Sequence, residues 1–79
     1  PVAPGLAHLA LAACHATVGT QAGVRRHVPA ALAHGCSAAQ VAEGLACVLL
    51  ECGANALIEA TSTWVEAAAA GECVPPYPP

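Results

Sequence analysis

The chain has 79 residues, of which 57% are hydrophobic and only 3% aromatic, and alanine is the commonest residue. A single small domain with so few large side chains buries little apolar area, so we expect it to gain stability by associating with copies of itself. The net charge of −3, with only two basic side chains, excludes a nucleic-acid-binding surface, and the high hydrophobicity excludes a disordered chain.

No segment is predicted to span a membrane. The longest apolar stretch, residues 45–58, is interrupted by Glu51, Gly53 and Asn55 and is too short to cross a bilayer. The N-terminal stretch is apolar but lacks the basic region of a signal peptide. We therefore expect a cytoplasmic location.

Glycines divide the first half of the chain into two predicted helices. Residues 6–18 are rich in Ala and Leu and contain no helix breaker. Residues 21–34 predict a second helix, with Thr20 as its N-cap and Gly35 just beyond its end. Pro29 lies inside this second helix and should kink or split it, because proline lacks the backbone donor.

The third predicted helix has the clearest start in the chain. Ser37 and Gln40 are spaced as a capping box, in which each side chain bonds the backbone of the other residue. Apolar residues then recur at helical spacing and predict one buried stripe. The stripe comprises Val41, Leu45, Val48, Leu49 and Cys52.

A fourth helix is predicted after Gly53, with Asn55 as its cap and Gly71 at its end. The expected buried face of this helix comprises Leu57, Ile58, Thr61, Trp64, Val65 and Ala68. Strand-like alternation is absent from the sequence, so we predict an all-α fold of about four helices over residues 1–72. Residues 73–79 form a proline-rich tail that could dock along a protein partner.

The five cysteines predict neither a disulfide framework nor a redox dithiol, because none are spaced as CxxC. In an alanine-rich chain, cysteine serves as a small buried hydrophobic residue, which we expect for Cys14, Cys47 and Cys52. Cys36 in a turn and Cys73 in the tail are expected to be exposed and more reactive.

Histidine is unusually frequent and follows a pattern. His8 and His15 are seven residues apart, as are His27 and His34, so each pair lies near one face of a helix. Two such helices packed antiparallel would bring the imidazoles together, either as a metal site or as solvent-facing, singly hydrogen-bonded groups. The tight spacings of metal motifs are missing, so we assign no metal ligand and no cofactor.

Glu51 stands out because it lies in the most apolar stretch of the chain. Either it faces solvent in the last turn of its helix, or it is buried beside a donor. In the buried arrangement it would be a general base or a member of a proton relay.

Three stretches, residues 24–35, 36–41 and 50–60, together resemble the carboxymuconolactone decarboxylase and alkyl hydroperoxidase D-like superfamily. Members typically have a helix with a His, an Ala-rich turn ending in Gly, and then a capped helix. Redox-active members carry a Glu, eleven residues, CxxC, three residues and a His. Here that spacing places His8, Thr20, Gly23 and His27 at those positions, so only the final His is kept and thiol peroxidase or disulfide reductase activity is not expected.

The resemblance to the decarboxylase branch implies a small helical subunit that forms a homotrimer or homohexamer. It implies a non-redox, lyase-like reaction on a small molecule, with His27 as general acid or base. Arg25 or Arg26 would clamp a carboxylate. We add His8 and Glu51 as assisting residues. Two alternatives remain: a non-catalytic structural subunit of a larger assembly, and histidine-based metal or haem binding.

Overall fold

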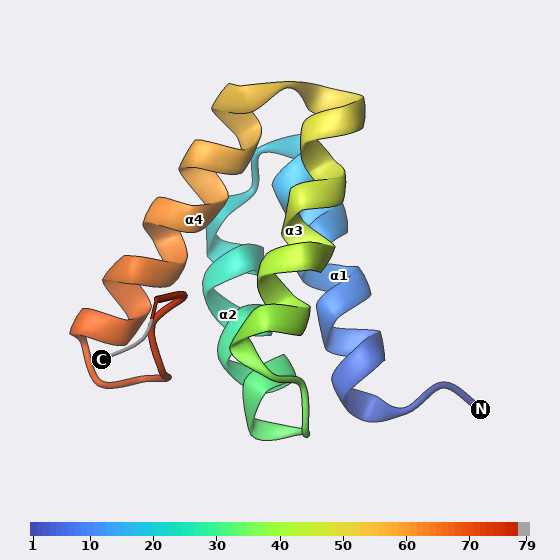
Figure 1. Cartoon of the computed structure of the whole chain (residues 1–79), viewed down its shortest axis with the longest axis vertical. Coiled ribbons are helices and arrows are strands. Elements are labelled where there is room, and N and C mark those ends of the chain that lie inside the picture. Colours follow the sequence, from blue (N-terminus) through green and yellow to red (C-terminus); the bar gives the residue numbers. More distant parts are fainter. Residues whose placement is uncertain (78–79) are drawn as a thin grey trace.

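Four helices and no strand make up residues 1–77, which are the residues that the computed structural model describes; this confirms the predicted all-α fold of four helices. Successive helices run in opposite directions, as Figure 1 shows, with the N-terminus and the segment that follows α4 near the same end of the bundle. The helices are α1 (Pro4–Val18), α2 (Gln21–Ala33), α3 (Ala38–Cys52) and α4 (Ala54–Ala69).

The first interhelical junction differs in detail from its prediction. α1 begins two residues earlier than predicted, at Pro4, because a proline at the first helical position loses no intrahelical bond. α1 ends at Gly19, whose φ of 78° is left-handed, and the Thr20 amide donates to the His15 carbonyl at 2.9 Å. Thr20 occupies the N-cap position of α2, but its hydroxyl makes no capping bond.

Pro29 does not split α2. The helix continues through it from Gln21 to Ala33. The flanking Val28 and Ala31 are completely buried, and we attribute the continuity to this burial, which opposes the local cost of a missing backbone donor.

The ends of α3 show one confirmed and one wrong prediction. The capping box is present: the Gln40 amide donates to Ser37 Oγ at 3.0 Å, and the Ser37 amide donates to Gln40 Oε1 at 2.8 Å. Asn55, in contrast, is not a cap. Gly53, with φ of 82°, forms the whole junction between α3 and α4, so α4 has already begun at Ala54.

The core is built mainly from small side chains. Its five largest fully buried residues are Trp64, Leu45, Val24, Val28 and Val41. Alanines from α1, α2 and α4 fill the remaining space and allow the helices to approach closely.

Two predicted buried faces are wrong in part. On α3, Leu49 is 44% exposed and Cys52 is exposed, although the first three positions of the stripe are buried. On α4, the buried residues are Ala60, Thr63, Trp64 and Ala67. The inner face of α4 is thus set by small residues around the tryptophan, while Leu57 packs at its edge and Ile58 is exposed.

The exposure of the cysteines is the reverse of what we expected. Cys14, Cys47 and Cys52 are exposed, whereas Cys36 and Cys73 are half-buried and pack against the core. The reason is that the two connecting segments fold back onto the helices. Cys36 Sγ lies against Gly5 of α1, and burial raises the pKa of the Cys73 thiol.

The segment after α4 is anchored to the core by one hydrogen bond. Trp64 Nε1 donates to the Val74 carbonyl at 2.8 Å, so the start of the predicted tail (residues 73–79) lies against the bundle. Residues 78–79 of that tail lie outside the described residues. None of the described helices is long and apolar enough to cross a membrane.

Candidate functional site

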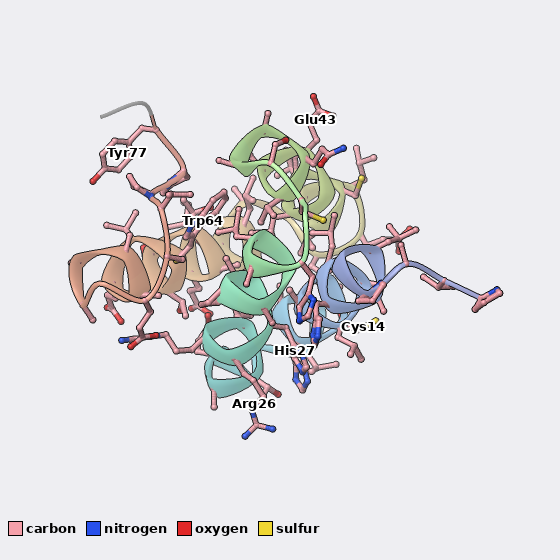
Figure 2. The ribbon with its side chains drawn as sticks, turned by 90° about the horizontal axis from the view of Figure 1, so that it is seen from below. Cys14, Arg26, His27, Glu43, Trp64 and Tyr77 are labelled. Carbon is pink, nitrogen blue, oxygen red and sulfur yellow. The ribbon has the colours of Figure 1, made fainter. Side chains whose placement is uncertain are left out.

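The contact between α1 and α2 gathers the four histidines into one column. The two helices pack antiparallel, so the histidines of one helix interleave with those of the other. The column runs in the order His34, His8, His27 and His15. In Figure 2, His27 lies between these two helices, and its ring is grouped with the other imidazoles.

Each neighbouring pair of rings in this histidine column is stacked. The ring centroids are 5.4 Å apart for His34 and His8, 5.3 Å for His8 and His27, and 5.5 Å for His27 and His15. The angles between the ring planes are 19°, 29° and 13° in the same order. These distances are typical of offset-stacked rings, so the four imidazoles form a continuous packed array.

A hydrogen bond joins the two central rings, between His8 Nδ1 and His27 Nδ1, which are 3.0 Å apart. One of these nitrogens must carry the proton and the other must accept it. The bond therefore fixes a different tautomer on each ring whenever both are neutral. It leaves the two Nε2 atoms as the nitrogens available for further interactions.

Two buried glycines allow α1 and α2 to approach at the ends of the column. A Cβ atom at Gly23 would overlap the His15 ring. A Cβ atom at Gly5 would lie 2.7 Å from the His34 carbonyl oxygen. Glycine is thus required at both positions for this packing.

The surroundings of His27 favour its neutral form. Loss of hydration lowers the pKa of His27, and the nearby His8, His15 and Arg26 lower it further by repelling a proton. No carboxylate contributes an opposing attraction. His27 consequently remains an uncharged base at neutral pH.

The two candidate anion-binding arginines differ in their surroundings. Arg25 lies against the segment that follows α4, where its Nε and Nη2 donate to the two carboxylate oxygens of Glu72, both at 2.8 Å. This bidentate pair lowers the pKa of Glu72 and raises that of Arg25. Arg26 is exposed, and its side chain points away from the helices in Figure 2. Arg26 is therefore the better placed of the two to receive an external carboxylate.

Glu51 is exposed in the last turn of α3, as one of the two sequence alternatives predicted. It makes no hydrogen bond or ion pair with any residue in the range 1–77. Its carboxylate has no influence on the pKa of His27. Of the predicted assisting residues, His8 alone contacts His27.

The surface hollows lie away from the histidine column. Three hollows have volumes of about 620, 350 and 460 Å³, and no histidine lines any of them. They lie on the outer face of α4, beside the Cys36 and Cys73 segments, and between α1 and α3. The column is accordingly a surface feature rather than the wall of one of these cavities.

The described part of the chain contains no group of three or more His, Cys, Asp or Glu side chains arranged to hold a metal ion. The ring geometry explains this result for the histidines. The rings lie in a row with centroids 5.3–5.5 Å apart, whereas the ligands of a metal ion must converge on one point.

Sequence reasoning missed part of this site. It brought the four histidines together between two antiparallel helices, but it gave a catalytic role only to His27 and His8 and gave no packing role to Gly23. The seven-residue spacing of both histidine pairs was the signal, because antiparallel packing converts two such pairs into one interleaved column. No protein-family model, curated protein or solved structure matches this chain.

Proposed function

We propose that this protein is a non-redox, carboxymuconolactone decarboxylase-like protein that acts on a small metabolite by acid–base chemistry at His27. The observation that carries the proposal is the hydrogen bond between His8 Nδ1 and His27 Nδ1. A partner on Nδ1 orients an imidazole and leaves its Nε2 to exchange a proton with a substrate.

The roles of the two histidines follow from the tautomers. With the proton on His27 Nδ1 donated to His8, His27 Nε2 holds a lone pair and acts as the base. When Nε2 takes a proton, Nδ1 keeps its own proton and its hydrogen bond to His8, so the ring stays in place. The lowered pKa of His27 maintains the unprotonated form before each reaction.

The proposed substrate is a small carbonyl compound, such as a lactone or a ketone, with at most one carboxylate. Arg26 binds that carboxylate from its exposed position next to His27. The net charge of −3 opposes the approach of a multiply charged anion. Glu51 assists only if a second subunit or a substrate brings it to His27.

Proton exchange tests this function even while the natural substrate is unidentified. A set of lactones and ketones in D₂O is monitored by NMR for catalysed exchange of the hydrogen next to the carbonyl group. We expect exchange with the unaltered chain and at least a hundredfold loss in His27→Gln, which is the usual contribution of a general base. His34→Gln, at the exposed end of the column, is the matched control and should retain most activity. Equal rates in both variants would refute the role of His27.

We also propose that the chain forms a homotrimer or homohexamer in the cytoplasm. The support is energetic: only one aromatic residue and one leucine are among the largest fully buried side chains. Sedimentation of the full chain at micromolar concentration tests this, and a stable folded monomer would contradict it.

A second function, as a non-catalytic subunit of a larger assembly, is favoured by one observation. No histidine lines any of the three hollows described above, which is the arrangement expected if the histidine column is not part of a substrate pocket. In this alternative the tail, residues 73–79, docks on a protein partner. It predicts no exchange with any carbonyl compound and unchanged helicity after deletion of residues 75–79. No group of three or more metal-ligating side chains among residues 1–77 supports the third alternative, metal or haem binding.

A further inference from the structure

The charged residues of the chain are separated along its sequence and therefore between its helices. Every arginine and histidine lies within residues 8–34, and all five glutamates lie within residues 43–72. The basic residues thus belong to α1, α2 and the turn after α2, whereas the carboxylates belong to α3, α4 and the segment after α4. The fold consequently has one pair of helices without any acidic group and one pair without any basic group.

These two halves expose their charges on opposite sides of the molecule. In Figure 2, the side chains of Arg26 and Glu43 point away from the bundle in opposite directions. We call Arg26 and the histidine column the basic face, and the exposed carboxylates of α3, Glu43 and Glu51, the acidic face. Both ion pairs among residues 1–77 use Arg25, so neither face is neutralised by an ion pair within that part of the chain.

Both faces also carry exposed aliphatic side chains. On α1, Val18 is 74% exposed and follows His15 by three residues, so the two are neighbours on the helix. On α3, Leu50 is 85% exposed and follows Glu43 by seven residues, which places both on one side of the helix. Each face therefore offers apolar area beside its charge, as a protein contact requires.

The charge of the basic face depends on pH. His8, His15 and Arg26 act on His27, no glutamate of α3 or α4 is among these groups, and His34 completes the column. An ordinary histidine takes up a proton near pH 6.5, whereas an ordinary glutamate keeps its charge down to about pH 4.3. Protonation at Nε2 also preserves the Nδ1 hydrogen bond at the centre of the column. Mild acid therefore adds positive charge to the basic face while the acidic face stays negative.

We propose that the basic face of one copy binds the acidic face of the next copy, and that this contact strengthens as the pH falls to about 6. Opposite charges select this pairing, because two basic faces or two acidic faces would repel each other. Since the faces lie on opposite sides, the contact is head-to-tail, and a pair keeps one free face of each kind to which further copies add. The contact is separate from the homotrimer or homohexamer proposed above, which does not depend on acid.

Sedimentation velocity of the full chain at about pH 7.5 and about pH 6 tests the pH dependence. Circular dichroism at each pH verifies that the helices are intact. At low ionic strength we expect the association constant to rise about tenfold or more at the acidic pH, with masses beyond the dimer at high concentration. The gain should disappear at about 0.5 M salt, because salt screens exposed charges.

Charge-reversal variants test which faces meet. Glu43→Lys changes the acidic face and Arg26→Glu changes the basic face. Glu59→Lys, at an exposed site on α4, changes the net charge as much as Glu43→Lys and is its matched control. We expect the first two variants each to lose most of the acid-dependent gain and Glu59→Lys to keep it. An equimolar mixture of Glu43→Lys and Arg26→Glu should associate again, because each variant faces a complementary charge on the other.

Four results would overturn the proposal. The first is an association constant at about pH 6 no higher than at about pH 7.5 in the folded chain. The second is an equal loss in Glu59→Lys and Glu43→Lys, which would assign the gain to net charge instead of the acidic face. The third is a mixture of the two face variants that does not associate. The fourth is acid-dependent binding to phosphatidylglycerol vesicles without any gain in self-association, which would assign the basic face to an anionic membrane. Association at the neutral pH is measured separately and reports on the proposed homotrimer or homohexamer.

Discussion

At the scale of single residues, Gly23 is a position where the histidine column depends on the absence of a side chain. Gly23→Ala would place a Cβ atom within the space of the His15 ring, which must then leave its stack on His27. We expect a loss of about 1–3 kcal/mol in the free energy of unfolding, measured by urea titration.

The same substitution made in a His15→Ala variant identifies the cause of that loss of stability. In His15→Ala the clashing ring is absent, and alanine favours a helix over glycine by about 1 kcal/mol. Gly23→Ala should therefore become neutral or stabilising in His15→Ala. The same destabilisation in both backgrounds would mean that the clash is with something other than His15.

The hydrogen bond from Trp64 Nε1 to the Val74 carbonyl also restrains Cys73, which directly precedes Val74. Trp64→Phe keeps an aromatic ring in the core but removes this donor. We expect the half-buried Cys73 thiol to become several-fold more reactive toward iodoacetamide, because burial is the main cause of its raised pKa and release of the segment removes that burial. This gain outweighs the loss of the contact with Trp64, which by itself lowers the pKa of the thiol. Mass spectrometry reports each cysteine separately. Cys14, exposed on α1, is the internal control, and an equal increase there would indicate general unfolding instead.

At the scale of helices, the packing of α1 on α2 should depend on pH. The pKa of His27 is lowered by folding, so the unfolded chain binds more protons than the folded chain between that lowered pKa and the ordinary value. Stability is complete above the ordinary histidine pKa and is lost as the pH falls through the folded value. Protonation also brings positive charge against His8, His15 and Arg26.

Urea unfolding at about pH 7.5 and about pH 5 measures this effect. We expect a lower free energy of unfolding at the acidic pH, and a smaller difference between the two values in His27→Gln. The ion pair of Glu72 with Arg25 titrates separately, because the lowered pKa of Glu72 moves its loss to more acidic conditions. An unchanged pH dependence in His27→Gln would assign the effect to other groups.

Local signals predicted the helices better than they predicted helix faces. Glycines with left-handed φ follow the helices at Gly19, Gly53 and Gly71, and the Ser37 capping box forms as its residues require. The predicted face of α4 was wrong in part because Ile58 and Val65 are larger than Ala60 and Ala67, which the helix buries instead. Hydrophobic size alone does not reveal that alanine faces pack more closely.

For the candidate site too, the sequence predicted which residues meet but not how their side chains are arranged. Heptad spacing indicated that His8, His15, His27 and His34 could meet between two antiparallel helices. It could not indicate whether the rings would converge on one point or stack, because that depends on the distance between the helix axes. Gly5 and Gly23 set that close approach, and their role is visible only when both helices are in place.

At the scale of the whole molecule, the small core and the apolar exterior have one common consequence. The described residues include exposed large hydrophobics on α1, α3 and α4, among them Leu50 at 85% and Ile58 at 60%. A chain that buries so little by itself should unfold at a temperature that depends on its concentration, because association stabilises only the folded form. For a dimer, each tenfold increase in concentration should raise the midpoint by about 3 °C or more.

Differential scanning calorimetry over a range of about a hundredfold in concentration measures this dependence. A concentration-independent midpoint in the unaltered chain would show that the four helices are stable alone, and that alanine packing around Trp64 is sufficient.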